Sequence, residues 1–177
     1  MAKKLIKFIS TEEFRKVLKA EKENKFKFAY VLGFGSGLRI SEIVGPAKNS
    51  NQEIKPIKSH QIDLQSKQIK VFGKGGKERI TTINPMFPIK ENMLKLLPLK
   101  INRRTLQNRF KKLCEKTLDK PLNFHTLRHG FANHMLNERG LPMPMVQGFG
   151  GWARLDTVGI YAKANPIQAI EKVWEGF

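Results

Sequence analysis

Two short stretches of this 177-residue sequence place basic side chains where they could bind a phosphate group. In the first, Arg39 follows a glycine turn at Gly37, and a fixed backbone there could aim its guanidinium at two phosphate oxygens. In the second, Lys74 stands among the glycines of 73–76, where it could protonate a leaving oxygen if nearby charge lowered its pKa. Taken singly, Arg39 could be an ordinary surface arginine and Lys74 a solvated turn lysine.

A third stretch pairs a histidine with an arginine. His125 and Arg128 are three residues apart, so both side chains can lie on one face of a helix. Near the start of that helix an anion would also meet free backbone amides, and histidine titrates close to neutral pH. The pair therefore predicts a phosphate site. We interpret the neighbouring His129 and His134 as packing or hydrogen-bonded core histidines, because they point elsewhere on the helix.

Trp152 and Tyr161 complete the set of candidate residues. Trp152 follows two glycines, and its indole N–H could donate to a phosphate oxygen, although a tryptophan is usually a core residue. Tyr161 is one of two tyrosines, and its phenol could act as a nucleophile if a base or positive charge assisted it. Tyr30 lies in an apolar segment and is expected to be structural. By itself Tyr161 would also be a core residue more often than a nucleophile.

Helices are expected to position most of these side chains. Ser10 and Glu13 form a predicted capping box, which opens a helix ending at about Ala20. Alternating apolar residues and a glycine turn predict a three-stranded antiparallel sheet at 61–83. Further helical patterns occupy about 26–34, a short segment from Ser41, a short segment between the prolines of 85–98, and then 103–118, 124–138, 142–149, 154–162 and 166–175. We therefore predict an α+β fold, mainly α-helical with a small three-stranded antiparallel β-sheet.

The composition indicates the class of partner. The chain has 33 Lys+Arg against 15 Asp+Glu, a formal net charge of +18, which attracts polyanions such as nucleic acid. An anionic membrane surface and structural RNA would also fit this charge. Cys114 is the only cysteine, so we expect no internal disulfide, no thiolate zinc site and a reducing, cytoplasmic location. No apolar run approaches the roughly 20 residues of a membrane span.

The order of these motifs is more specific than any one of them. From about residue 11 to 165 the sequence resembles the tyrosine site-specific recombinases, or integrases. The box 37–42 is similar to the family's first arginine box, and Lys74 falls in the hairpin where the family carries its lysine. The segment 125–132 resembles the second box, with a histidine and the second arginine, and Tyr161 follows it at the nucleophile position.

The resemblance has two departures from the family pattern. Many members have Gly-His before the tyrosine, where this chain has Gly151-Trp152, and we expect Trp152 to replace that histidine through its N–H and its bulk. Members also carry an N-terminal helical domain that closes a clamp around DNA. Because the resemblance starts almost at once here, we expect 1–177 to be a single catalytic domain with the N-terminal core-binding clamp domain absent.

The resemblance implies a mechanism for site-specific DNA recombination. Arg39 and Arg128 would hold the non-bridging oxygens of one phosphate, while Tyr161 attacks phosphorus to give a 3′-phosphotyrosine and a free 5′-hydroxyl. Lys74 would protonate the departing oxygen. His125 would assist proton movement at the tyrosine, Trp152 would support the phosphate, and Glu42 would orient its neighbours. One phosphodiester replaces another, so we expect no cofactor and no metal.

The implied partner is double-stranded DNA, bound by a tetramer that assembles through the apolar C-terminal helix at 166–177. The alternative is that this helix packs on the apolar core of its own subunit and has no role in assembly. Three other functions remain open at this point. The first is topoisomerase IB-like nicking and closing, the second is a non-catalytic DNA-binding module of the same fold, and the third is binding of RNA.

Overall fold

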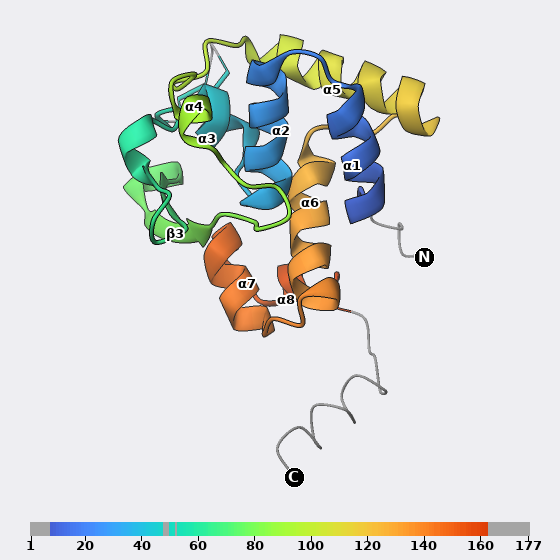
Figure 1. The fold of residues 1–177 in the computed structure, drawn as a ribbon. Coiled ribbons are helices and arrows are strands. Elements are labelled where there is room, and N and C mark those ends of the chain that lie inside the picture. The colour runs from blue at the N-terminus through green and yellow to red at the C-terminus, as the bar shows by residue number, and fades with distance from the viewer. Residues whose placement is uncertain (1–7, 48–49, 52, 163–177) are drawn as a thin grey trace.

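The computed structural model describes residues 8–47, 50–51 and 53–162, and of Lys74 it describes the backbone alone (Figure 1). The expected helix at 166–175 lies outside the described residues. The order of elements confirms the predicted mainly helical α+β fold. The helices are α1 (Thr11–Ala20), α2 (Asn24–Gly35), α3 (Ile40–Val44), α4 (Glu91–Leu94), α5 (Arg103–Leu118), α6 (His125–Asn133), α7 (Met143–Gly150) and α8 (Asp156–Gly159). The strands are β1 (Ile62–Asp63), β2 (Gln68–Phe72) and β3 (Glu78–Thr82).

Local hydrogen bonds explain where the helices begin. The backbone N–H of Glu13 donates to Ser10 Oγ over 3.2 Å, and the Ser10 N–H donates to Glu13 Oε2 over 3.0 Å, which confirms the predicted capping box of α1. Asn102 caps α5 in a similar way, accepting from the N–H of Arg104 over 2.8 Å. Both helices have the bounds that the sequence predicts, because their caps are local in the chain.

The sheet is a three-stranded antiparallel meander in the order β1-β2-β3. Ile69 pairs with Thr81 and Val71 pairs with Arg79, so these four side chains share one face of the sheet. Ile69, Val71 and Thr81 are buried on that face. The sheet therefore directs Arg79 inward, toward the helices, although an arginine on the buried face of a strand is unusual.

Helix α6 connects the two apolar cores of the molecule. It packs against α2 at the larger core, and against α7 at a smaller core made by Phe131, Ala132, Met135, Val146, Val158 and Tyr161. Figure 1 shows α6 beside α1 and α2, with α7 and α8 at its far end. Strand β3 also contacts α7. None of the described helices has both the length and the apolar character needed to cross a bilayer.

The second half of the expected 124–138 helix differs from the prediction. After Asn133 the chain continues as a π-helical turn, η3 (His134–Glu138). Three contacts hold this turn. His134 lies within hydrogen-bond distance of Thr11 Oγ1 and of Glu138, and Asn137 donates to the backbone carbonyl of Tyr161. The interpretation of His134 as a hydrogen-bonded core histidine is confirmed. The turn itself depends on partners far away in the sequence, so apolar periodicity does not reveal it.

Gly130 is required where α6 approaches the core. A Cβ atom there would lie 2.5 Å from the carbonyl oxygen of Ile9 and 2.7 Å from the ring of Phe34. We expect Gly130→Ala to lower the free energy of unfolding by about 2 kcal/mol, because the overpacking outweighs the better helix propensity of alanine. The matched control is Gly148→Ala on α7, where a Cβ meets nothing within 4 Å and a gain of about 0.5 kcal/mol is expected. Urea unfolding measures both, and equal effects would contradict the packing argument.

Candidate active site

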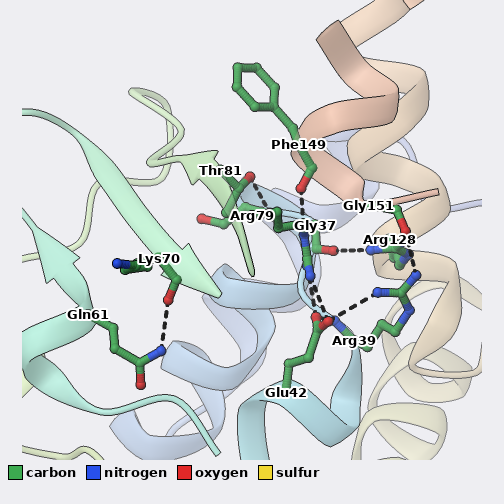
Figure 2. Close-up of polar contacts among 11 residues, drawn as sticks. Gly37, Arg39, Glu42, Gln61, Lys70, Arg79, Thr81, Arg128, Phe149 and Gly151 are labelled. Carbon is green, nitrogen blue, oxygen red and sulfur yellow. Dashed lines mark hydrogen bonds and ion pairs between the residues drawn. The ribbon is translucent and has the colours of Figure 1, made fainter. Parts of the chain in front are cut away.

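The glycine turn before α3 brings the two predicted arginines together. Gly37 has a φ of +68°, and a Cβ there would lie 2.6 Å from the ring of Phe131 on α6. The turn therefore runs directly against α6. Arg128 Nη1 donates to the Gly37 carbonyl over 2.6 Å, while Arg39 follows two residues later at the N-terminus of α3 (Figure 2). Residues 91 positions apart in the chain thus meet at one turn.

Arg39 is held from two sides and remains partly exposed. Its Nη1 donates to Glu42 Oε1 over 3.1 Å, and its Nη2 donates to the Gly151 carbonyl over 3.0 Å. Its side chain is 36% exposed. The guanidinium is therefore fixed in direction and can still contact a ligand at the surface.

Arg128 is an almost fully buried guanidinium, 2% exposed. The Trp152 ring stacks against it at 4.0 Å, which gives the predicted tryptophan a definite partner. Besides Nη1, its N–H groups at Nε and Nη2 are buried and have no hydrogen-bond acceptor among the described residues. Burial, and then the positive charges of Arg39 and Arg79, lower the pKa of Arg128 to about 9. An anion beside this guanidinium would offset the cost of burying its charge and the repulsion from the neighbouring arginines.

A cavity of about 380 Å³ joins three of the predicted residues. Arg39, His125 and Arg128 line it, together with Arg103 and Gln107 from the first turns of α5. Partial desolvation, and then the charges of Arg128 and Arg39, lower the pKa of His125. The imidazole is therefore neutral near pH 7, and positive charge in the cavity comes from arginine side chains.

Tyr161 lies in the smaller apolar core, 5% exposed, just beyond α8. Its hydroxyl is hydrogen-bonded to His129 Nδ1, so His129 is a half-buried, hydrogen-bonded histidine whose partner is the predicted nucleophile. Burial raises the pKa of the Tyr161 phenol to about 12, against the opposing charge of Arg128. The His129 ring is 4.4 Å from that of His125 in a T-shaped arrangement. His129 therefore lies between the tyrosine and the cavity-lining histidine.

Glu42 and Arg79 form a support beneath the site. Both guanidinium nitrogens Nη1 and Nη2 of Arg79 donate to the Glu42 carboxylate, over 2.7 and 2.9 Å, and Arg79 Nε donates to the Phe149 carbonyl over 2.9 Å (Figure 2). Because Glu42 also binds Arg39, it orients its neighbours as expected. Sequence reasoning missed Arg79. The signal that could have found it was an arginine at an inward position of the third strand.

The hairpin of Lys74 borders the same site. Its neighbour Gly73 lines a second cavity of about 480 Å³ together with Arg39, Arg79 and Trp152. The side chain of Lys74 itself lies outside the described part of the structure. The described residues thus bring Arg39, His125, Arg128, Trp152 and Tyr161 into one region, and Gly73, the neighbour of the sixth predicted residue, borders it.

We expect Glu42→Gln to lower the free energy of unfolding by about 3 kcal/mol at pH 7. The substitution leaves Arg79 and Arg39 close together without their buried carboxylate. Burial raises the pKa of Glu42, but the hydrogen bonds and charge of Arg79, and then Arg39, outweigh it, so the pKa lies below its usual 4.5. The stabilisation is therefore present above pH 4.5 and is lost as pH falls through the lower folded pKa.

Urea unfolding of the wild type and Glu42→Gln at a series of pH values measures this effect. The difference between the two proteins should be largest at neutral pH and should shrink in acid. A difference that stayed constant from pH 7 to about pH 3 would show that the carboxylate charge is not its source.

Comparison with known proteins gives the family. The Phage integrase family matches residues 86–167. The tyrosine recombinase XerC of Thermodesulfovibrio yellowstonii is 31% identical over 94% of this chain and 61% of its own length. The tyrosine recombinase XerA of Pyrococcus horikoshii is 32% identical over 96% of this chain and 62% of its own length. The chain thus spans about three fifths of the length of these two relatives.

Solved structures share the fold. A crystal structure of XerA recombinase has a TM-score of 0.67 at 21% identity, covering 98% of this chain and 66% of its own. The catalytic domain of bacteriophage HP1 integrase has a TM-score of 0.60 at 16% identity, covering 94% of this chain and 95% of its own. The arginine boxes, the fold and the sequence similarity lead to the same conclusion: the chain belongs to the phage integrase family of tyrosine recombinases.

Proposed function

We propose that this chain is the catalytic domain, residues 1–177, of a site-specific DNA recombinase that cleaves and rejoins DNA through a 3′-phosphotyrosine. The observation that carries the proposal is the buried Arg128 guanidinium, with two N–H groups that lack an acceptor among the described residues, beside a cavity that Arg39 shares. A buried cation with free donors suits a phosphate oxygen. Double-stranded DNA supplies such phosphates.

The two arginines would act mainly in the transition state. Arg39 and Arg128 hold the non-bridging oxygens and stabilise the negative charge that grows on them during attack. Both guanidiniums are fixed before DNA arrives, Arg39 by Glu42 and Gly151 and Arg128 by Gly37 and the Trp152 ring. Little reorganisation is then needed in the reaction itself.

The remaining residues supply the nucleophile, the proton transfers and the support of the phosphate-binding group. Tyr161 attacks phosphorus in line, and the 5′ oxygen departs with a proton from Lys74. His125 borders the phosphate cavity from the first turn of α6, so it contacts the phosphate and assists the movement of protons there. The stack on Arg128 makes Trp152 a support for the phosphate-binding guanidinium. The exchange of one phosphodiester for another conserves bond energy, so the scheme uses no cofactor and no metal.

The structures of similar proteins support DNA as the partner. One is described as XerH site-specific recombinase bound to its difH substrate, with a TM-score of 0.64 at 22% identity. Another is a Tn1549 transposon integrase in complex with transposon right end DNA, with a TM-score of 0.61. A formal net charge of +18 favours the same partner here, and binding should weaken steeply as salt rises.

Recombination also requires assembly, and this part of the proposal concerns the C-terminal segment. Four copies would join on DNA in the cytoplasm, each placing residues 166–177 on a neighbour. That segment lies outside the described residues, and its apolar positions at roughly helical spacing are the support for the idea. A chain ending at 165 should keep its affinity for a single DNA site and lose DNA-dependent assembly in analytical ultracentrifugation.

Covalent selection from a random DNA pool tests the function whatever the target sequence is. Nicked duplexes with randomised cores are incubated with the protein, and DNA that remains attached under denaturing conditions is sequenced. Recovery of one shared sequence, followed by strand exchange between two duplexes that carry it, is the expected result. Adducts without a shared sequence, accompanied by relaxation of supercoiled plasmid, would indicate a topoisomerase-like enzyme. DNA binding without any adduct would indicate a binding module.

A further inference from the structure

The hydroxyl of Tyr161 contacts a histidine that the family resemblance did not single out. Its partner is Nδ1 of His129 on α6, and the two rings lie 5.3 Å apart at an angle of 38°. His125, to which the resemblance gave the role of assisting the tyrosine, lines the phosphate cavity instead. Within the described part of the chain, His129 is thus the imidazole that is hydrogen-bonded to the reacting oxygen.

A second contact shows that this placement of Tyr161 is built into the fold. Asn137 in the π-helical turn η3 donates to the Tyr161 carbonyl over 2.8 Å, and to Asn133 Oδ1 over 2.8 Å. His129, Asn133 and Asn137 follow one another at intervals of four residues. One continuous helical segment therefore holds both the backbone and the hydroxyl of the tyrosine. The π turn brings Asn137 to the carbonyl, as unusual helical turns often do near functional sites.

The protonation states give the hydrogen bond its direction. Burial, and then the charges of His125 and Arg128, lower the pKa of His129 to about 4, so its ring is neutral at pH 7. The charged and titratable groups that face it are His125 and Arg128 on α6 and Tyr161 beyond α8. With its pKa of about 12, Tyr161 keeps its proton at pH 7. The phenol is thus the donor and the imidazole the acceptor. A phosphate bound at Arg128 would add negative charge nearby and increase the affinity of His129 for a proton.

We propose that His129 is a catalytic residue that accepts the proton of Tyr161 during attack on DNA. The inference rests on the proposed function. As Tyr161 Oη forms its bond to phosphorus, the hydroxyl proton moves to His129 Nδ1. The bond from phosphorus to the 5′ oxygen breaks, its electron pair stays on that oxygen, and the oxygen takes a proton from Lys74. Rejoining reverses each transfer: the 5′-hydroxyl returns its proton to Lys74, and His129 returns its proton to the tyrosine.

Single-turnover cleavage by His129→Gln tests this role. The substrate is a nicked duplex of the selected site with sulfur in place of the bridging 5′ oxygen, because a thiolate leaves without a proton and removes the contribution of Lys74. Glutamine keeps a hydrogen-bonding group and cannot take a proton. His60→Gln is the matched control, since His60 is exposed on η1 (Ser59–Gln61) and away from the tyrosine.

We expect His129→Gln to cleave about 100-fold more slowly than the wild type at pH 7, and His60→Gln to match the wild type. Without an internal base, the phenol must lose its proton to solvent, so the rate of His129→Gln should rise about tenfold per pH unit between about pH 7 and pH 8.5, below the pKa of about 9 at which Arg128 loses its charge. The wild-type rate should stay flat over that range. A loss of packing would lower the rate without creating this slope.

A more acidic phenol provides an independent measurement. Fluorotyrosine at position 161 should reduce the difference between His129→Gln and the wild type, because a phenol that ionises more easily depends less on a base. Cleavage by His129→Gln within threefold of the wild type, or a pH profile as flat as that of the wild type, overturns the inference. If the wild type itself forms no adduct, the proposed function is wrong, and the role of His129 is rejected together with it. An adduct formed by the wild type, with no deficit in His129→Gln, rejects the role of His129 alone.

Discussion

Tyr161→Phe is expected to abolish the covalent protein–DNA band and to leave DNA affinity almost unchanged. The substitution removes the nucleophilic oxygen, so cleavage should fall by on the order of 10⁴-fold or more. The ring still fits the smaller core, because Tyr161 is 5% exposed and packs among apolar side chains. Affinity depends on arginine and lysine contacts with phosphates, which the substitution does not touch. A nicked duplex that traps the intermediate, followed by a denaturing gel, measures the adduct.

The second tyrosine of the chain is the matched control for this experiment. Tyr30 is fully buried in α2, and its hydroxyl donates to Glu21 Oε2 over 3.1 Å. Tyr30→Phe removes the same atom from a structural site, so it should keep the covalent band while losing about 1 kcal/mol of stability. A band that persists in Tyr161→Phe and disappears in Tyr30→Phe would show that Tyr161 is not the nucleophile.

Arg128→Met is expected to lower the cleavage rate by about 10²- to 10³-fold and to leave the protein at least as stable as the wild type. The loss of rate follows from removing two donors from the phosphate site. The stability result follows from burial: the fold lowers the pKa of Arg128 to about 9, which means that it disfavours the charged guanidinium. Methionine has a similar length and no charge, so it removes the cost of burying a charged group. This gain offsets the loss of the hydrogen bond to Gly37 and of the stack on Trp152.

The sign of the pH effect can be checked for the same pair of proteins. Because the folded pKa of Arg128, about 9, lies well below the usual arginine value, the unfolded chain binds more protons than the folded chain above about pH 9. The wild type should therefore gain stability relative to Arg128→Met as pH rises above 9. Guanidinium unfolding at pH 7 and pH 10 measures this difference.

A paired arginine provides the contrast to Arg128. Arg109 on α5 donates from Nε and Nη2 to the buried Glu21 carboxylate, over 2.9 and 2.7 Å, and also binds Glu23. Arg109→Met should lower the free energy of unfolding by about 2–3 kcal/mol, because it leaves Glu21 without its cation, and cleavage should remain. If both methionine variants lost stability equally, the charge of Arg128 would serve to stabilise the fold. It would then not be a destabilising charge that the protein keeps in order to bind phosphate.

Much of the fold could be predicted because its signals are local. The capping box of Ser10 and Glu13 and the pattern of 103–118 fix helix ends through neighbours in the chain. The glycines after Lys74 have positive φ angles of +72° and +70°, which suit the turn of a hairpin. Boundaries were less predictable where contacts are distant. The expected helix at 154–162 is reduced to Asp156–Gly159, and the helix after Asn133 becomes a π turn.

The sequence by itself determined which chemical groups are present and in what order, since the boxes around Arg39 and Arg128 and the tyrosine at 161 are patterns along one chain. Only the tertiary structure decided which groups meet. It placed His129 and not His125 at the Tyr161 hydroxyl, and it joined Arg79 to Glu42 across 37 positions. The physical reason is that spacing on a helix limits the face a side chain can occupy, whereas its partner is selected by the packing of other elements against that face.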